Sequence, residues 1–335
     1  MSEHVPGRTA LVTGGAGFIG SHLSERLLEQ DWEVYALDDL STGSEANVWQ
    51  FARNPYFHLA VESVLSPAVV SELVHRCDVV FHLAAAVGVR LIVERPGHTL
   101  LTNVRGTENV LEYASRFEKP VLVASSSEVY GDHVAENLPL AEDARRIYGP
   151  TTAKRWAYAD SKAMDEFLAL ARYEEDGLQS VIARLFNTVG PRQSGQYGNV
   201  IPRFVQAALA GEPLEIHGDG SQTRCFCHVA DTTRALAALM EEPATRGEIY
   251  NVGSTEAVTI LELADRVLEA TDSSSEIVFV PYEEVYGQGI EEMFQRKPAI
   301  DKIRAAVGWA PTIDLDGILA EVVEVARSRG VPSAT

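Results

Sequence analysis

Two side chains spaced by about one helical turn, Tyr158 and Lys162, are the leading candidates for chemistry in this chain. Residues four apart on a helix share a face, so the phenol and the ammonium should point the same way. A phenol with an ordinary pKa of about 10 is a poor base at neutral pH. A neighbouring ammonium would favour the phenolate and lower the pKa of Tyr158 into a range that is useful for proton transfer. This spacing alone is also common on helix surfaces, so the interpretation needs support from other motifs.

A glycine-rich loop near the N-terminus supplies that support. It follows a predicted buried strand at 8–13 and precedes a predicted helix at about 21–30, which is the context that a dinucleotide-binding loop requires. Such glycines let backbone N–H groups approach a pyrophosphate, and the helix N-terminus adds partial positive charge. The glycines of the loop are Gly14, Gly17 and Gly20.

An acidic residue, Asp38, ends the second predicted strand at 33–38. Its carboxylate is placed to accept a hydrogen bond from a ribose 2′-hydroxyl and would repel a 2′-phosphate. The sequence therefore predicts NAD as cofactor rather than NADP. The alternative is an ordinary glycine-rich turn followed by a solvated acidic pair, Asp38 and Asp39.

Strand and helix patterns alternate through the first half of the chain. Further buried strands are predicted at 79–83, 121–124 and 180–184, and helices at about 67–75, 99–117 and 156–176. This alternation predicts an α/β fold, a doubly wound parallel sheet of the Rossmann type. After Asn187 the elements become shorter: helices at about 200–210, 230–241, 259–270 and 314–328, and a strand at 214–217.

Two domains follow from this change of pattern. We expect a Rossmann domain at 1–185, to which the segment at about 226–255 returns, and a smaller mixed α/β domain at 186–335. The chain of 335 residues, 46% hydrophobic and 23% charged, is long enough for such cores.

The charge and the termini bound the possible partners. A formal net charge of −20 repels nucleic acid. No apolar run long enough for a transmembrane helix occurs, and the first residues lack the features of a signal peptide. We therefore expect neither nucleic acid nor a membrane as partner.

The cysteines indicate a reducing compartment. Three of them, Cys77, Cys225 and Cys227, cannot form an even disulfide framework, which predicts a cytoplasmic location. Cys225 and Cys227 have no partners at structural zinc spacing, so no metal site is expected.

Taken together, the motifs resemble those of the extended short-chain dehydrogenase/reductase family. Its members act on nucleotide-diphosphate sugars as epimerases, dehydratases and decarboxylases. The resemblance runs from about residue 8 to residue 325 and implies a Rossmann domain that holds NAD, a C-terminal domain that grips the nucleotide sugar, and a homodimer joined through the helices at 99–117 and 156–176. The segments that carry it are the glycine loop, Asp38–Gly43, His82–Ala85, Asn103, Ser125–Gly131 and Tyr158–Lys162.

The resemblance also assigns cofactor contacts. Ser63 and Val64 should lie near adenine, and Leu83, Ala84 and Ala85 should pass under the cofactor. The remaining expected contacts are Gly14, Gly17, Phe18, Ile19, Gly20, Asp38, Asn103, Tyr158 and Lys162.

In the catalytic scheme that the family implies, Tyr158 removes the proton of the sugar 4-hydroxyl while a hydride leaves C4 for NAD. Lys162 holds the nicotinamide ribose and favours the phenolate, and Ser126 hydrogen-bonds the same hydroxyl. Outside this family, Ser126 would be read as a serine that caps its own backbone.

Substrate contacts follow from two further segments. These segments, Arg184–Arg192 and Gly218–Phe226, resemble the nucleotide-sugar segments of the family. The resemblance implies that Asn187 and Arg224 contact the diphosphate, with Arg192 a further candidate, and the planar donor fork of arginine suits phosphate. His82 lies in an apolar strand, and a satisfied core histidine is a better interpretation than a catalytic base.

Glu128 and Arg296 separate the subfamilies. The residue before Glu128 is Ser127, whereas family dehydratases carry an Asp there, so 4,6-dehydration is not expected. UDP-glucuronate decarboxylases share the Glu and an Arg that matches Arg296. Oxidation at C4 makes a β-keto acid that loses CO2, and Arg296 would orient the carboxylate or assist reprotonation at C5. Alternatively, Arg296 clamps the pyrophosphate and Glu128 is merely an acid at a strand end.

The segment Ala86–Leu91 is closer to the epimerase pattern. The sequence therefore predicts an NAD-dependent enzyme, UDP-glucuronate decarboxylase giving UDP-xylose, with a UDP-glucose or UDP-glucuronate 4-epimerase as the alternative. A non-catalytic NAD sensor is the third hypothesis, and it would need neither Tyr158, Lys162 nor Ser126.

Overall fold

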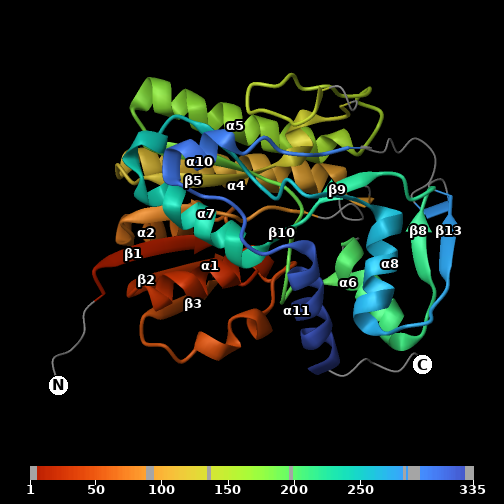
Figure 1. The fold of residues 1–335 in the computed structure, drawn as a ribbon. Coiled ribbons are helices and arrows are strands. Elements are labelled where there is room, and N and C mark those ends of the chain that lie inside the picture. The colour runs from red at the N-terminus through yellow and green to blue at the C-terminus, as the bar shows by residue number, and fades with distance from the viewer. Residues whose placement is uncertain are drawn as a thin grey trace.

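Seven parallel strands form the central sheet of the computed structural model, which describes residues 6–87, 94–133, 137–195, 199–281, 284–285 and 295–328. The strand order is β11-β6-β5-β4-β1-β2-β3 (Figure 1). The strands are β1 (Arg8–Thr13), β2 (Trp32–Asp38), β3 (Phe57–Val61), β4 (Val79–His82), β5 (Val121–Ser126), β6 (Ser180–Leu185) and β11 (Ile249–Val252).

Helices cover both faces of this sheet. Successive residues of a strand point to opposite faces, so neighbouring residues pack against different helices. On β1, Ala10 and Val12 pack into a core with α1 and α7, whereas Leu11 packs into a second core with α2 and α4. The predicted doubly wound α/β fold is confirmed. The helices of this part are α1 (Phe18–Glu29), α2 (Pro67–Arg76), α4 (Pro96–Arg116), α5 (Trp156–Asp176), α7 (Val229–Glu241) and α10 (Asp301–Val307).

A smaller group of elements gathers beside the sheet, at the right of Figure 1, around a core of its own. Its helices are α6 (Val200–Ala210), α8 (Ile260–Thr271) and α11 (Leu315–Ser328), and β8 (Leu214–His217) pairs with β13 (Ile277–Val280). Two short pairs lie between the regions: β7 (Thr188–Val189) with β10 (Cys227–His228), and β9 (Thr223–Cys225) with β12 (Ala257–Thr259).

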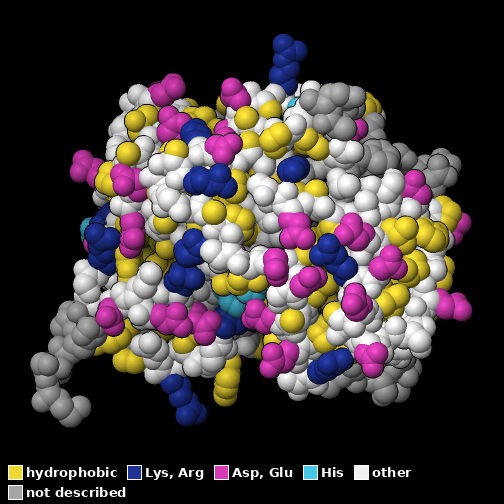
Figure 2. All heavy atoms as spheres, viewed as in Figure 1, with side chains coloured by type: hydrophobic (Ala, Val, Ile, Leu, Met, Phe, Trp, Pro, Cys, Tyr) yellow, Lys and Arg dark blue, Asp and Glu magenta, His cyan; other side chains and the backbone are white. Residues whose placement is uncertain are grey.

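Part of the C-terminal half belongs to the large sheet. Strand β11 pairs with β6, and α7 packs against α1. The segment at about 226–255 therefore lies with the N-terminal elements, while the domain boundary after residue 185 stays a prediction. Among the described helices, none has the length and apolarity needed to cross a bilayer. Figure 2 shows acidic side chains spread over the face in view, with basic ones between them.

Candidate active site

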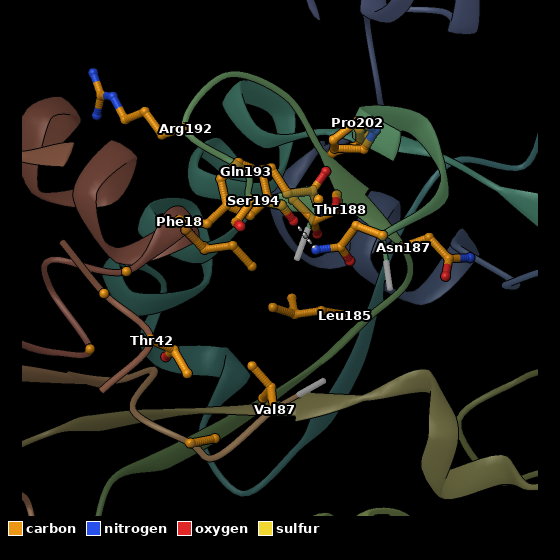
Figure 3. Close-up of a pocket in the computed structure, with 18 of the residues that line it drawn as sticks. Phe18, Thr42, Val87, Leu185, Asn187, Thr188, Arg192, Gln193, Ser194 and Pro202 are labelled. Carbon is orange, nitrogen blue, oxygen red and sulfur yellow. Dashed lines mark hydrogen bonds between the residues drawn. The ribbon is translucent and has the colours of Figure 1, made fainter. Parts of the chain in front are cut away.

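A cavity of about 1770 Å³ lies across the carboxyl ends of the parallel strands, and part of its wall is drawn in Figure 3. Asp38, Leu83, Ser126 and Leu185, at or just beyond the ends of four strands, contribute to its wall. Ligands of doubly wound sheets bind at this edge, where the strand order reverses. The volume exceeds what a single drug-sized ligand needs, so a dinucleotide and a second ligand could share it.

The glycine loop fits a dinucleotide. Gly14 adopts a φ of 70°, and a Cβ on Gly20 would lie 2.0 Å from the Gly14 carbonyl oxygen, so a side chain at position 20 would force the loop apart. Helix α1 begins after Gly17 and carries no acidic residue in its first turn. Its first N–H groups therefore face the cavity as an anion site, and Gly17, Phe18, Ile19 and Gly20 line the wall there.

Asp38 is anchored beside this loop. Its Oδ2 accepts from the Ala16 N–H at 3.0 Å and its Oδ1 from the Leu40 N–H at 2.9 Å. Burial raises the pKa of this carboxyl, and the two backbone N–H groups oppose the rise. A carboxylate with remaining lone pairs at the cavity wall fits a ribose hydroxyl, so the residues present suit NAD.

For Asp38→Asn we expect NAD to bind about 10- to 100-fold more weakly, because a hydrogen bond to a charged group is worth about 1.5–3 kcal/mol. The preference of the enzyme for NAD over NADP should fall as well, since the charge that repels a 2′-phosphate is gone. Calorimetric titration with both dinucleotides measures this. Asp39→Asn is the matched comparison, because Asp39 also lines the cavity but is exposed and bonds the Ser41 N–H instead of the glycine loop. Equal losses in both variants would contradict the role of Asp38.

Two predicted cofactor residues, Ser63 and Asn103, lie behind the cavity wall rather than on it. The Ser63 hydroxyl accepts from the Leu65 N–H at 3.2 Å. Asn103 Oδ1 accepts from the Ala86 N–H at 2.7 Å, and its Nδ2 donates to Ser161 Oγ at 3.0 Å. Both side chains thus bond neighbouring residues of the chain, and their contact with the cofactor stays a prediction. The other predicted cofactor residues line the cavity: Gly14, Gly17, Phe18, Ile19, Gly20, Asp38, Val64, Leu83, Ala84, Ala85, Tyr158 and Lys162.

The predicted catalytic residues meet at one part of the cavity. Tyr158 and Lys162 come from α5, Ser126 ends β5, and Glu128 lies in the 3-10 helix η3 (Ser127–Tyr130). Burial and the charge of Glu128 raise the pKa of Tyr158, and a hydrogen bond from Ser126 and the charge of Arg296 oppose this. Ser126 also caps η3, because its Oγ accepts from the Glu128 N–H at 3.2 Å. The capping interpretation of Ser126 is therefore seen in the structure, and its catalytic role stays a prediction.

Lys162 has a partner that the sequence analysis missed. Its Nζ donates to Asp165 Oδ2 at 2.8 Å, and both side chains are buried. The expectation was that Lys162 lowers the pKa of Tyr158. In the structure the hydrogen bond of Ser126 and the charge of Arg296 lower the pKa of Tyr158, whereas the charge of Asp165 raises it, and the effect of Lys162 stays a prediction.

Arg296 lies at the catalytic end of the cavity. Its Nη1 donates to Ser127 Oγ at 3.3 Å and lies 3.6 Å from Glu128 Oε1. The backbone of its segment is fixed by Leu140, which bonds the Lys297 carbonyl at 2.8 Å. A serine at position 127 thus accepts from the arginine. This position near Tyr158 supports a role at the reacting sugar over a pyrophosphate clamp.

The three predicted diphosphate contacts differ in their orientation. Asn187 and Arg224 line the cavity; Asn187 Nδ2 donates to the Cys225 carbonyl at 3.2 Å, and Arg224 is buried. Arg192 also lines the cavity, and it pairs with Glu25 on α1. Figure 3 shows its guanidinium directed away from Phe18 and Leu185. That any of the three contacts a diphosphate stays a prediction.

Arg155 is a cavity residue that the sequence analysis missed. It immediately precedes α5, is 8% exposed, and lines the wall together with Tyr158. Its position three residues before Tyr158 on a helical pattern was a readable signal. The prediction on Ala86–Leu91 falls partly outside the described residues, which end at Val87 and resume at Glu94.

His82 and the thiols take no part in this site. His82 lies between the hydroxyls of Thr13 and Thr107, at 2.8 and 3.0 Å, and burial lowers its pKa to about 3. It is a satisfied core histidine. Burial raises the pKa of Cys225 and of Cys227 to about 12, so neither thiol is a ready nucleophile or ligand.

Comparison with known proteins defines the class. Residues 10–253 match the model of the NAD dependent epimerase/dehydratase family. The chain belongs to this family: it is an enzyme whose cofactor is NAD, and the predicted resemblance is confirmed.

Its relatives include decarboxylases and epimerases. The chain is 41% identical, over 95% of its length and 97% of the relative's, to a UDP-N-acetyl-alpha-D-glucosaminuronate decarboxylase of Bacillus cytotoxicus. It is 37% identical to UDP-glucuronic acid decarboxylase 6 of Arabidopsis thaliana, over 96% and 90%. A UDP-glucuronic acid 4-epimerase from Bacillus cereus, solved in complex with NAD, matches with a TM-score of 0.83 at 27% identity, over 96% and 99%.

Proposed function

We propose that this enzyme decarboxylates a UDP-hexuronate through transient oxidation at C4 of the sugar. The observation that carries the proposal is the group of buried Arg296 and Ser127 with half-buried Glu128 next to Tyr158. A second buried arginine, Arg155, lines the same wall. Cationic side chains at the reacting end of a cavity, in a chain of net charge −20, suit a sugar that carries a carboxylate.

The proposed steps use the geometry as follows. Tyr158 accepts the proton of the 4-hydroxyl, and Ser126 hydrogen-bonds the same oxygen. NAD, when bound, takes the hydride from C4 and returns it at the end. The C5–C6 bond of the resulting β-keto acid then breaks, CO2 leaves, and the electron pair moves onto the C4 oxygen as an enolate. Arg296 orients the departing carboxylate, and Glu128 assists protonation at C5.

Lys162, Asn187 and Arg224 complete the proposed contacts. Lys162 holds the nicotinamide ribose, with two of its three N–H donors beyond the bond to Asp165. Asn187 and Arg224 contact the diphosphate. These roles follow from the positions of the side chains on the cavity wall.

The decarboxylase relatives support this reaction more strongly than the 4-epimerase alternative, because they are 37–41% identical whereas the epimerase structure is 27% identical. The two decarboxylase substrates differ only in the substituent at C2, which is remote from the bond that breaks. UDP-glucuronate, giving UDP-xylose, and its 2-acetamido counterpart are therefore the two candidates.

Separate incubations with these two uronates, with UDP-glucose and with UDP-N-acetylglucosamine test the proposal. Product NMR should show loss of C6 from one or both uronates and no reaction of the neutral sugars. A product inverted at C4 with all its carbon retained would favour the epimerase instead. If the protein binds NAD but neither binds nor converts any of these UDP-sugars, the hypothesis of a non-catalytic NAD sensor is favoured.

We infer a homodimer formed through α4 and α5. Apolar side chains on these helices are open to solvent in the single chain, including Leu101 at 52%, Met164 at 48% and Phe167 at 60%. Burying such a surface against a second copy would be favourable. Light scattering of the purified protein should give twice the mass of the chain, and a monomer would overturn this. Unpaired buried thiols fit the expected cytoplasmic location.

A further inference from the structure

Asp165 is a fully buried carboxylate to which the proposed reaction assigns no role. It lies on α5 beyond Lys162, with 0% exposure against 3% for Lys162. Their Nζ and Oδ2 atoms are 2.8 Å apart. A buried ion without a partner tends to lose its charge. The two opposite charges therefore compensate one another at this buried position.

The groups around the Lys162–Asp165 pair come from three elements. On α4, the Thr107 hydroxyl joins Lys162 in lowering the pKa of the carboxyl against the effect of burial. On β4, His82 is neutral, because burial lowers its pKa to about 3. On α5, the next residue is Glu166.

Glu166 does not compete for Lys162. Its two carboxylate oxygens accept from Arg184 at 2.8 and 2.7 Å, and Ser125 donates to it at 2.5 Å. Among the described residues, Asp165 is thus the carboxylate that forms an ion pair with Lys162.

We propose that Asp165 is a positioning residue of the active site: its carboxylate is the counter-ion that keeps Lys162 protonated at the cavity wall, and it thereby sets the pH range in which Tyr158 and Lys162 work together. The inference rests on the proposed role of Tyr158 as the base, and not on which sugar is the substrate.

Removal of the Asp165 charge should lower the pKa of both Lys162 and Tyr158. Lys162 would remain buried without a counter-ion, so its pKa would fall, and it would lose its proton at a lower pH. Asp165 also raises the pKa of Tyr158, so the phenolate would form at a lower pH. Both limbs of the pH profile should therefore move in the acid direction. A nearby opposite charge shifts a pKa by about 1–3 units, and the larger movement is expected for the alkaline limb.

Asp165→Asn tests this, because the amide keeps the shape and removes the charge. We expect both limbs of the kcat/KM profile at lower pH, the alkaline limb by at least about one unit. In the NAD-loaded protein, ultraviolet difference spectra against Tyr158→Phe should show the phenolate forming at lower pH as well. NAD should bind more weakly at alkaline pH.

Asp231→Asn is the matched control. Like Asp165, Asp231 is buried and forms an ion pair, in its case with Arg234. It lies on α7 and accepts hydrogen bonds from the backbone N–H groups of Thr312 and Ile313. This control should lower the melting temperature and leave both limbs in place. If Asp165→Asn behaves in the same way, with lower activity but unmoved limbs, Asp165 is only structural and the proposal is overturned.

A second pair of variants keeps the test open if Asp165→Asn does not fold. In Lys162→Met the unpaired Asp165 should take up a proton, and Lys162→Met/Asp165→Asn removes both buried charges, which cores tolerate better than one. These two proteins should bind NAD equally and titrate Tyr158 alike. A further loss in the double variant would contradict the proposal. The NAD and phenolate titrations need no sugar, so they remain readable if the decarboxylation itself fails.

Discussion

Replacement of Tyr158 by phenylalanine is expected to reduce turnover by about 100- to 10,000-fold, the range that a positioned general acid–base contributes. The substitution removes only the hydroxyl that accepts the C4 proton. The ring stays in its buried place on α5, so NAD binding and the melting temperature should stay close to those of the unaltered protein. Steady-state kinetics on the accepted UDP-sugar measure the effect.

Tyr35→Phe is the control for this variant. The Tyr35 hydroxyl donates to Glu33 at 3.1 Å on β2, away from the cavity, and its loss should leave turnover unchanged. Near-normal turnover of Tyr158→Phe would remove Tyr158 from the mechanism, and with it every reaction that begins by oxidation at C4.

The Glu128→Gln variant should still oxidise C4 and release CO2 in a first turnover, but it should lose about 100-fold or more in steady-state turnover, because protonation of the enolate at C5 is impaired. The absorbance of reduced cofactor should then rise and persist after substrate is added. Since Glu128 raises the pKa of Tyr158, its neutralisation should also move the acid limb of the pH profile to lower pH.

Asp132→Asn provides the comparison for Glu128→Gln, because Asp132 is an exposed acid four residues further along the chain. It should behave as the unaltered protein. If Glu128→Gln forms the final UDP-sugar product at an unaltered steady-state rate, Glu128 is an acid at a strand end without a catalytic part.

The sheet was predictable where strands are buried and close to glycine or acidic landmarks. β1, β2 and β5 read directly as apolar runs, and α5 matched its prediction at both ends. Two strands of the sheet were missed. β3 is an edge strand with mostly half-buried residues, and β11 joins β6 from far along the chain. Pairing over such separations depends on tertiary packing and leaves little local signal.

The site was predictable as residue types but not as partnerships. The contact of Arg296 with Ser127 joins residues 169 apart in sequence, and no spacing rule gives it. Arg192 was assigned by motif as a diphosphate contact, and its pair with Glu25 joins residues 167 apart in sequence. The pair of Lys162 with Asp165 lies within one helical turn and was readable. What the sequence lacked was the burial that makes the pair an electrostatic unit.

The most direct test of the central claim is the reaction in deuterated water, with UDP-glucuronate and its 2-acetamido counterpart as substrates and product analysis by NMR and mass spectrometry. Decarboxylation replaces the C6 carboxylate by a hydrogen from exchangeable groups. We therefore predict CO2 release and a pentose product with a single deuterium at C5. A hexuronate product inverted at C4, with all its carbon and no deuterium from solvent, would contradict the account.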